Sequence, residues 1–301
     1  MSLNNKIDFA VVFTVKKANP NGDPLNGNRP RIDYEGLGEV SDVCLKRKLR
    51  NRLQDMGEDI FVQSDDNRKK GDTFKSLKER FDANKEIQTI VLKAAEEKKK
   101  TKRKPSISDK LAEAACKAWY DVRAFGQVFA FDNSEESDSL SIGVRGPVSI
   151  QSAVSLAPVE LYSQQITKSV NLETDKKDPD KKGSDTMGMK HRVEHGVYVT
   201  YGSINCQLAE KTGFCAEDAD KLLSALKSLF VNDESAARPS GSMKIESVVW
   251  WKHNCKSGQY ASADVHESIE IKVDETTKKP VVKIKTPLDG LEPIIYSGEN
   301  K

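Results

Sequence analysis

The chain of 301 residues has little cysteine, few aromatic side chains and no long apolar run. Its five cysteines form no Cys-x-x-Cys pair, which argues against a disulfide framework or a zinc site and fits a reducing cytoplasm. The N-terminal MSLNNKID lacks a basic-then-apolar leader, and the apolar run from Phe9 to Phe13 is far too short to cross a bilayer. We therefore expect a cytoplasmic protein without a membrane partner, a metal or another cofactor.

The net charge is also small, only +2, although charged residues make up 31% of the chain and the mean hydropathy is −0.61. Any nucleic-acid-binding face must then be a local patch of segregated cations. Aromatic residues reach only 7%, and the chain has no Walker-type phosphate loop, nucleotide fingerprint or nucleophile elbow. Recognition of a nucleic acid would rest on backbone charge and shape more than on base stacking.

Residues 19–52 combine a loop rich in Asn, Gly and Pro with a basic helix. Asn21-Gly22 and Asn26-Gly27 favour positive φ and tight turns, which let backbone N–H groups face a ligand. A helix is expected after Ser41 and adds its dipole. Its five cations are Lys46, Arg47, Lys48, Arg50 and Arg52. The combination suits a row of phosphates, and the alternative is a structured loop before a solvated helix.

Hydrophobic periodicity predicts the elements around this segment. Alternation over 7–15 predicts a strand with one buried face, and apolar residues at helical spacing over 45–56 predict a helix packed on it. A second helix should begin near Ser106 or Ser108, after Pro105. A β-rich block, 122–159, should follow, with one strand through 142–150.

The second half of the chain gives a similar alternation of strand and helix. The segment 197–208 changes phase, which predicts a strand with a bulge near Gly202-Ser203. A helix is expected over 217–230, and strands over 245–251 and 265–273. Without its insertions the order is strand, helix, strand, strand, helix, strand, which is the ferredoxin-like order of an α+β fold.

Several motifs together resemble one protein family. They are NPNGDPLNGNRPRID from Asn19, SDVCLKRK from Ser41, VRAFGQVFAF from Val122, SIGVRGPVSIQSAVSLAPV from Ser141, TMGMKHRVEHGVYVTYG from Thr186 and DESAARPSGSM from Asp233. In this order they resemble the backbone subunit of the CRISPR type I-C Cascade, a member of the Cas-seven family within the RAMP-like superfamily.

The resemblance implies a ferredoxin-like (RRM-like) palm with a helical finger insertion and a β-hairpin thumb. We map the palm to 1–56, 122–159 and 196–301, the finger to 57–121 and the thumb to 160–195. It also implies a non-enzymatic subunit that binds guide RNA (crRNA) and stacks head to tail with other copies. The implied partners are target DNA paired to the guide, the capping, large and small Cascade subunits, and a recruited helicase-nuclease.

In the resembled family the thumb displaces one guide base at regular intervals. A side chain that opens a base step should be apolar because it replaces stacking, and Met187 and Met189 fit this role. The alternative is that both methionines pack under the hairpin as core. Lys190, His191 and Arg192 follow and could bind phosphate beside them. The remaining predicted RNA contacts are Arg31, Ser41, Lys46, Arg47, Arg50, Arg123, Arg145 and Arg238.

Two further types of chemistry compete with plain binding. His191 and His195 could form a metal site or a general acid–base pair, although the strand-like sequence after them disfavours chelation. Asp23 or Asp33 could cut RNA, as an acidic residue does in a comparable loop of related type III backbone subunits. The alternative for both aspartates is the capping of turns beside Pro and Gly. We favour binding over an RNA-cleaving nuclease.

Overall fold

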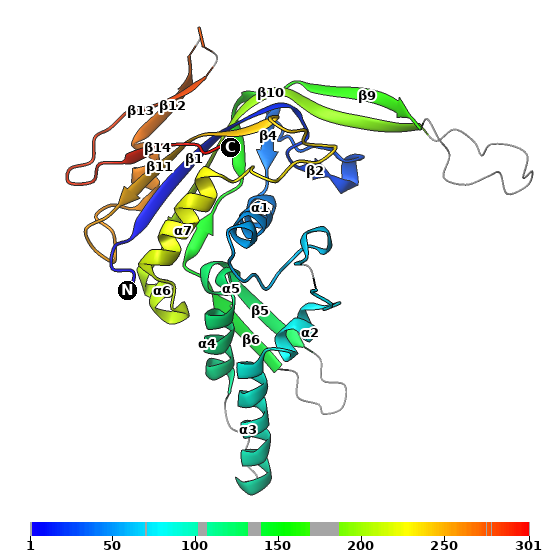
Figure 1. Ribbon diagram of the computed structural model, residues 1–301. Helices are drawn as coiled ribbons and strands as arrows, with labels where there is room; N and C mark the ends of the chain where they lie inside the picture. Colours follow the sequence, from blue (N-terminus) through cyan, green and yellow to red (C-terminus); the bar gives the residue numbers. More distant parts are fainter. Residues whose placement is uncertain are drawn as a thin grey trace, which may run out of the picture.

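The computed structural model describes residues 2–69, 71–101, 107–131, 140–168, 187–274, 276–277 and 279–300. It shows a mixed α/β structure around a large antiparallel sheet (Figure 1). Across the sheet the strands are β14 (Ile294–Ser297), β11 (Met243–Lys252), β1 (Ile7–Ala18), β10 (Met187–Ile204), β8 (Ala153–Pro158) and β4 (Leu37–Val40). Two more strands, β7 (Val148–Ile150) and β9 (Leu161–Thr167), pair with β10.

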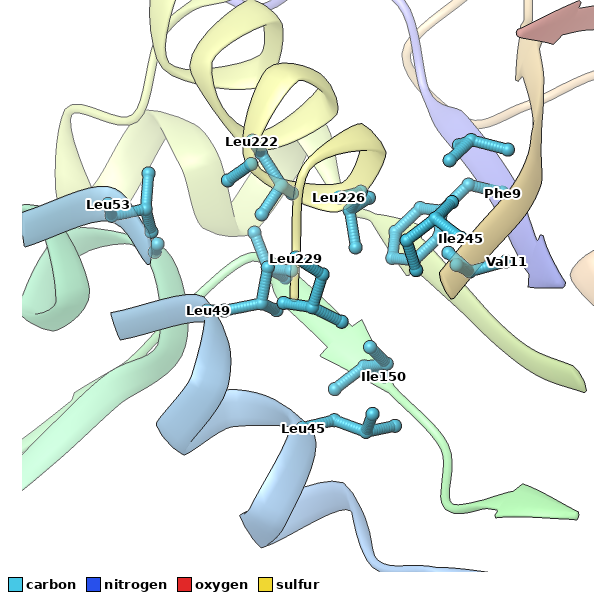
Figure 2. Packing of buried hydrophobic residues seen from close by; sticks show 14 of the residues in the cluster. Phe9, Val11, Leu45, Leu49, Leu53, Ile150, Leu222, Leu226, Leu229 and Ile245 are labelled. Atoms are coloured by element: carbon cyan, nitrogen blue, oxygen red, sulfur yellow. The ribbon is translucent and has the colours of Figure 1, made fainter. Parts of the chain in front are cut away.

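The main core lies between this sheet and the helices α1 (Asp42–Asp55), α6 (Cys206–Thr212) and α7 (Ala216–Lys227). Figure 2 shows apolar side chains of α1 and α7 meeting beside strands β1 and β11: Leu45, Leu49, Leu53, Leu222, Leu226, Phe9, Val11 and Ile245. The predicted start of α1 is confirmed, since the Ser41 hydroxyl accepts a hydrogen bond from the Cys44 N–H at 3.3 Å.

The other face of β1 is buried as well, so the prediction of one buried face is wrong. Ala10 of β1 joins Val249 and Trp251 of β11 in a separate cluster under α8 (Ser262–Glu267) and the pair β12 (Ile269–Val273) and β13 (Pro280–Ile284). β1 therefore lies at the centre of the fold with an apolar layer on each side. Alternation alone could not show this, because the second face of β1 mixes the apolar Ala10 and Val12 with the charged Asp8, which is also buried.

A second core forms around residues 57–145. It combines α2 (Leu77–Asp82), α3 (Lys85–Thr101), α4 (Ser108–Ala118), α5 (Tyr120–Phe125), and the hairpin β5 (Gly126–Phe131) with β6 (Leu140–Arg145). Its aromatic side chains Phe61, Phe81, Trp119 and Phe129 pack together. The helix predicted near Ser108 is confirmed. The β-rich block predicted from Val122 begins instead with α5.

Three other sequence predictions are wrong in detail. The strand expected over 142–150 is two strands, β6 and β7, separated at Gly146-Pro147. β10 has no bulge at Gly202-Ser203, because its pairing with β1 keeps one register there; the phase change marks the end of β10 and the start of α6. The segment expected as a strand from Val265 begins within α8.

The hairpin of β9 and β10 extends away from the body of the sheet (Figure 1). Its paired arms agree with the hairpin expected from the sequence, with Met187 opposite Thr167 and Val193 opposite Leu161. The polar tip predicted over 171–185 lies outside the described residues, as does part of the Lys-rich run 98–104. Within the described part of the chain, no helix has the length and apolar character needed to span a membrane.

Candidate nucleic-acid interface

The loop between β1 and α1 is tied to the start of the helix. It contains the short pair β2 (Gly22–Asp23) and β3 (Arg29–Pro30), and β3 packs against β10. The Asn21 Oδ1 atom accepts hydrogen bonds from the Ser41 N–H at 3.0 Å and from the Ser41 hydroxyl at 2.9 Å. One amide side chain thus fixes the loop to the residue that caps α1, and the loop adjoins the base of the hairpin.

The two Asn-Gly pairs act differently. Gly27 has φ of 59° and Asn28 follows with φ of 58°, so the second pair makes the expected left-handed turn. Gly22 lies in β2, and its missing side chain leaves room for the Asn28 side chain. The Asn19 amide donates to the Asn28 carbonyl oxygen at 2.7 Å. The first pair therefore serves close packing within the loop.

The predicted cations of α1 are mostly engaged within the protein. Lys46 pairs with Asp42 at 3.0 Å and keeps 28% of its side chain exposed. Arg47 donates to the Val62 carbonyl oxygen at 2.7 Å, and burial, with Arg50 nearby, lowers the pKa of its guanidinium. Of the predicted contacts on α1, Lys46 offers its charge most freely to a ligand.

Arg50 joins α1 to the second core. Its Nε atom donates to Asp121 at 2.9 Å, and the Asp121 carboxylate is 1% exposed. The same carboxylate accepts hydrogen bonds from the N–H groups of Phe61 at 2.7 Å and Val62 at 3.1 Å. Asp121 thus neutralises Arg50 and holds the chain after α1. This pairing was not predictable from local sequence, because Asp121 lies 71 residues from Arg50 in the chain.

Two further predicted contacts also sit in ion pairs. Arg123 binds Asp218 at 2.8 Å; burial lowers its pKa, but the hydrogen bond to Asp218 outweighs burial and the pKa is raised overall. Arg238 binds Asp233 at 3.0 Å, and the same carboxylate pairs with the buried Lys48.

Burial lowers the pKa of Lys48, against the attraction of Asp233. The Arg31 guanidinium lies 3.4 Å from the Asp23 carboxylate.

Arg145, by contrast, is exposed and has no ion pair with a described residue. It borders a cleft of about 1080 Å³ that α4, β6 and α6 line.

The hairpin presents its polar residues more openly. Lys190 is exposed and has no ion pair with another residue in the described ranges. Arg192 lies over the Tyr162 ring at 4.7 Å and pairs with Glu194 at 3.0 Å. His191 is 8% exposed, and its Nδ1 atom shares a hydrogen bond with the Ser163 hydroxyl at 2.8 Å.

Met187 and Met189 lie outside every hydrophobic cluster of the described chain. Their exposed fractions are 64% and 54%, so the alternative of ordinary core packing is wrong. Gln165 donates its amide N–H to the Met187 sulfur at 2.9 Å. Two flexible apolar side chains therefore lie at the far end of the described hairpin arms, beside the exposed Lys190, an arrangement that suits insertion between bases.

The candidate enzymatic groups have structural partners. The Asp33 carboxylate accepts hydrogen bonds from the N–H groups of Glu35 at 2.9 Å and Leu37 at 2.8 Å. Asp23 accepts one from the Leu25 N–H at 3.2 Å. His191 is buried whereas His195 is exposed, and no group of three or more potential metal ligands occurs among the described residues. Both aspartates have the turn-capping role of the alternative interpretation.

Comparison with known proteins identifies the family. The family model described as "CRISPR-associated protein Cas7" matches residues 5–286. A curated protein of that name from Haloferax volcanii is 29% identical over 233 residues, which are 74% of this chain and 63% of the relative's length. The chain therefore spans less than two thirds of that relative.

Two solved chains also resemble the structure. One belongs to a "CRISPR RNA-guided surveillance complex, pre-nicking", with TM-score 0.41, 15% identity, and coverage of 82% of this chain and 78% of that one. The other belongs to a "CRISPR RNA-guided surveillance complex", with TM-score 0.43, 16% identity, and coverage of 82% and 68%. Because the family model spans nearly the whole sequence, this chain belongs to the CRISPR-associated protein Cas7 family.

Proposed function

We propose that this protein is the guide-RNA-binding backbone subunit of a type I-C Cascade, which polymerises along crRNA and presents it to target DNA. Membership of the Cas7 family supports the class of complex. The observation that carries the proposal is the placement of the 19–41 loop against both α1 and β10, next to a hairpin with exposed Met187, Met189 and Lys190. The motifs of these segments support the I-C subtype.

The proposed palm is ferredoxin-like. Its elements would be β1, α1, β8, β10, α7 and β11, and the observed order β11-β1-β10-β8 is the one that such a palm requires. We propose residues 57–121 as the finger and 160–195 as the thumb. The packing of Phe129 and Ile142 with Phe61 supports extending the finger through β6, to residue 145.

The proposed binding mode divides the work between protein and guide. The protein would hold the sugar–phosphate backbone, and base pairing to one DNA strand would supply sequence specificity. Copies would stack head to tail, a contact that does not close on itself. The RNA and the capping subunits would then limit the length of the filament. The other proposed partners are the large and small Cascade subunits and a recruited helicase-nuclease.

The proposed phosphate contacts differ in how far protein partners already neutralise their charge. Lys46, Lys190 and Arg145 carry charge that is exposed or only locally paired. Ser41 and Arg31 lie in the 19–41 loop, which Asn21 fixes to the start of α1. Arg47, Arg50, Arg123, His191, Arg192 and Arg238 would each contact RNA while keeping a protein partner. An arginine can do both, since its guanidinium has five donors.

Purification with the guide tests the proposal. The chain is co-expressed with repeat-derived RNA, washed at high salt, and the retained RNA is sequenced after nuclease digestion. Uniform guide protected at regular intervals is the expected result. Protein that elutes free of nucleic acid, both alone and with the other Cascade subunits, would overturn it.

We propose further that the chain binds RNA without cutting it. Support comes from the turn-capping hydrogen bonds of Asp23 and Asp33, which occupy one oxygen of each carboxylate. Incubation of the bound RNA with Mg²⁺ or Mn²⁺ decides the point. Fragments that disappear in an Asp33→Asn or Asp23→Asn variant would make the chain a nuclease instead.

A further inference from the structure

The side-chain alternation of β1 breaks near its C-terminal end. Phe9, Val11, Phe13 and Val15 point into the main core from every second position, but the next β1 residue in that core is Ala18, three positions on. Successive residues of a strand face opposite sides of the sheet, so a spacing of three needs one residue that departs from the regular backbone.

Lys17 is that residue. Its φ is 53°, in the left-handed region that a lysine rarely occupies. The pairing with β10 continues around it, with Lys16 opposite His195 and Ala18 opposite Val193, while Lys17 has no paired residue. Its side chain is exposed and forms no ion pair with a described residue. Core packing therefore gives no reason for a lysine here.

β10 changes phase at the same place. Tyr198 and Ile204, at even positions, lie in the main core, and so does Val193, at an odd position. Gly196, opposite Val15, has no room for a side chain, because an added Cβ would lie 2.8 Å from the Tyr198 ring and 3.0 Å from Val159. The two paired strands thus reverse their alternation together, next to the tightly packed Gly196.

The reversal decides which way the hairpin faces. Beyond it, the odd positions of β10 continue the helix-bearing face of the sheet, so Met187 and Met189 share a face with the buried Val193. With regular alternation the odd positions would continue the opposite face, where Ala10 and α8 lie. A strained residue in a well-packed sheet is a recurrent sign of a functional constraint.

We propose that Lys17 is a positioning residue for guide binding: its left-handed backbone turns the hairpin so that Met187 and Met189 face the same side as α1 and the 19–41 loop. The inference rests on the proposed function for its purpose, but the turn itself can be tested without RNA. The role belongs to the backbone conformation, so the charge of Lys17 is dispensable.

Four variants separate conformation from charge. Lys17→Gly favours the left-handed region and Lys17→Ala removes the charged side chain beyond Cβ, whereas Lys17→Val strongly disfavours positive φ. Lys16→Gly is the matched control at a neighbouring exposed position with regular pairing. Thermal unfolding gives the first readout: Lys17→Gly should raise Tm, and Lys16→Gly should lower it. An equal lowering of Tm in Lys17→Gly and Lys16→Gly would mean that Lys17 has no left-handed backbone. This comparison holds even if Lys17→Val fails to fold.

Hairpin orientation gives the second readout. Spin labels at Thr167→Cys on β9 and Val43→Cys on α1, in a Cys255→Ser background, report the distance between hairpin and helix in RNA-free protein. Lys17→Gly and Lys17→Ala should keep the parent distance distribution, and Lys17→Val should shift it. An unshifted distribution in folded Lys17→Val, or a shift in Lys17→Ala, would overturn the positioning role.

The third readout links the turn to RNA. Unlabelled Lys17→Val should lose the regular spacing of guide protection, while Lys17→Gly and Lys17→Ala retain it. If the parent protein binds no guide, the proposed function fails. Thermal unfolding and the spin-label distances still test whether the Lys17 backbone sets the hairpin orientation. If the parent binds guide and Lys17→Val shows the parent spacing despite a shifted hairpin, the purpose assigned to Lys17 is wrong.

Discussion

Helix α1 and the β9–β10 hairpin both carry clusters of basic residues, but they use the charge differently. On α1, Lys48 and Arg50 neutralise the carboxylates of Asp233 and Asp121, and Lys48 is 4% exposed. On the hairpin, Lys190 is exposed beside two exposed methionines. Most cations of the helix therefore bind partners elsewhere in the fold, whereas Lys190 and the two methionines of the hairpin remain exposed to a ligand.

The comparison shows what charge patterns can and cannot predict. Five cations within seven residues of α1 look like a phosphate-binding face, yet each of them has a protein partner, on the helix itself or elsewhere in the chain. A surface role needs charge that is both exposed and uncompensated.

The largest effect is expected from removal of Arg50. Arg50→Met leaves the Asp121 carboxylate buried without its cation, and loss of one partner of a buried pair costs about 3 kcal/mol of unfolding free energy. Urea denaturation measures the change. Lys46→Met is the matched control on the same helix, and its surface pair should cost less than about 1 kcal/mol. Equal losses in the two variants would erase the distinction between a cation that joins two parts of the fold and one that is paired only within its own helix.

This contrast also marks the limit of prediction from sequence. The Ser41 cap, the helices α1 and α7 and the hairpin arms were predictable because their signals are local. The partners of Arg50, Arg123 and Lys48 were not, because Asp121, Asp218 and Asp233 lie 71, 95 and 185 residues away in the chain. The left-handed turn at Lys17 was equally unpredictable, since no glycine or asparagine marks its positive φ in the sequence.

A smaller effect should follow from neutralising Lys46, which is paired only within its own helix, together with the exposed Lys190. Lys46→Gln with Lys190→Gln should weaken guide binding regardless of sequence. It should also reduce the slope of log K against log salt by about 1.4, at about 0.7 per single-strand phosphate contact. Titrations at several salt concentrations give the slope. Lys272→Gln with Lys283→Gln, on the distant β12–β13 pair, is the control and should leave it unchanged. A slope equal to that of the parent would remove both lysines from the interface.

The opposite face of the sheet should contribute a modest dependence of stability on pH. His266 lies in a buried cluster with Asp8, whose carboxylate also binds Lys6 at 3.0 Å and His253 at 2.8 Å. Burial lowers the pKa of His266 below its ordinary 6.5. The unfolded chain therefore binds a proton first, so this stability is complete above pH 6.5 and is lost as the pH falls through the lowered value.

His266→Gln should remove that part of the pH dependence. Thermal unfolding at pH 7.5 and 5.5 measures it, and the variant should lose less Tm on acidification than the parent. His195→Gln, which changes an exposed histidine, is the control. The same loss of Tm in the His266 variant and the parent would mean that other groups set the acid sensitivity.

The smallest effect on stability, and the most specific effect on function, should come from the hairpin methionines. Met187 and Met189 are more than half exposed, so Met187→Ser with Met189→Ser should change the unfolding free energy by less than about 0.5 kcal/mol. The same double variant should bind guide but lose the regular spacing of protection, because a serine cannot replace stacking between opened bases. Leu92→Ser, at another exposed apolar residue on α3, should alter neither property. An unchanged footprint would leave the hairpin with phosphate contact alone, and a large loss of stability would mean that its apolar face already packs within the free protein.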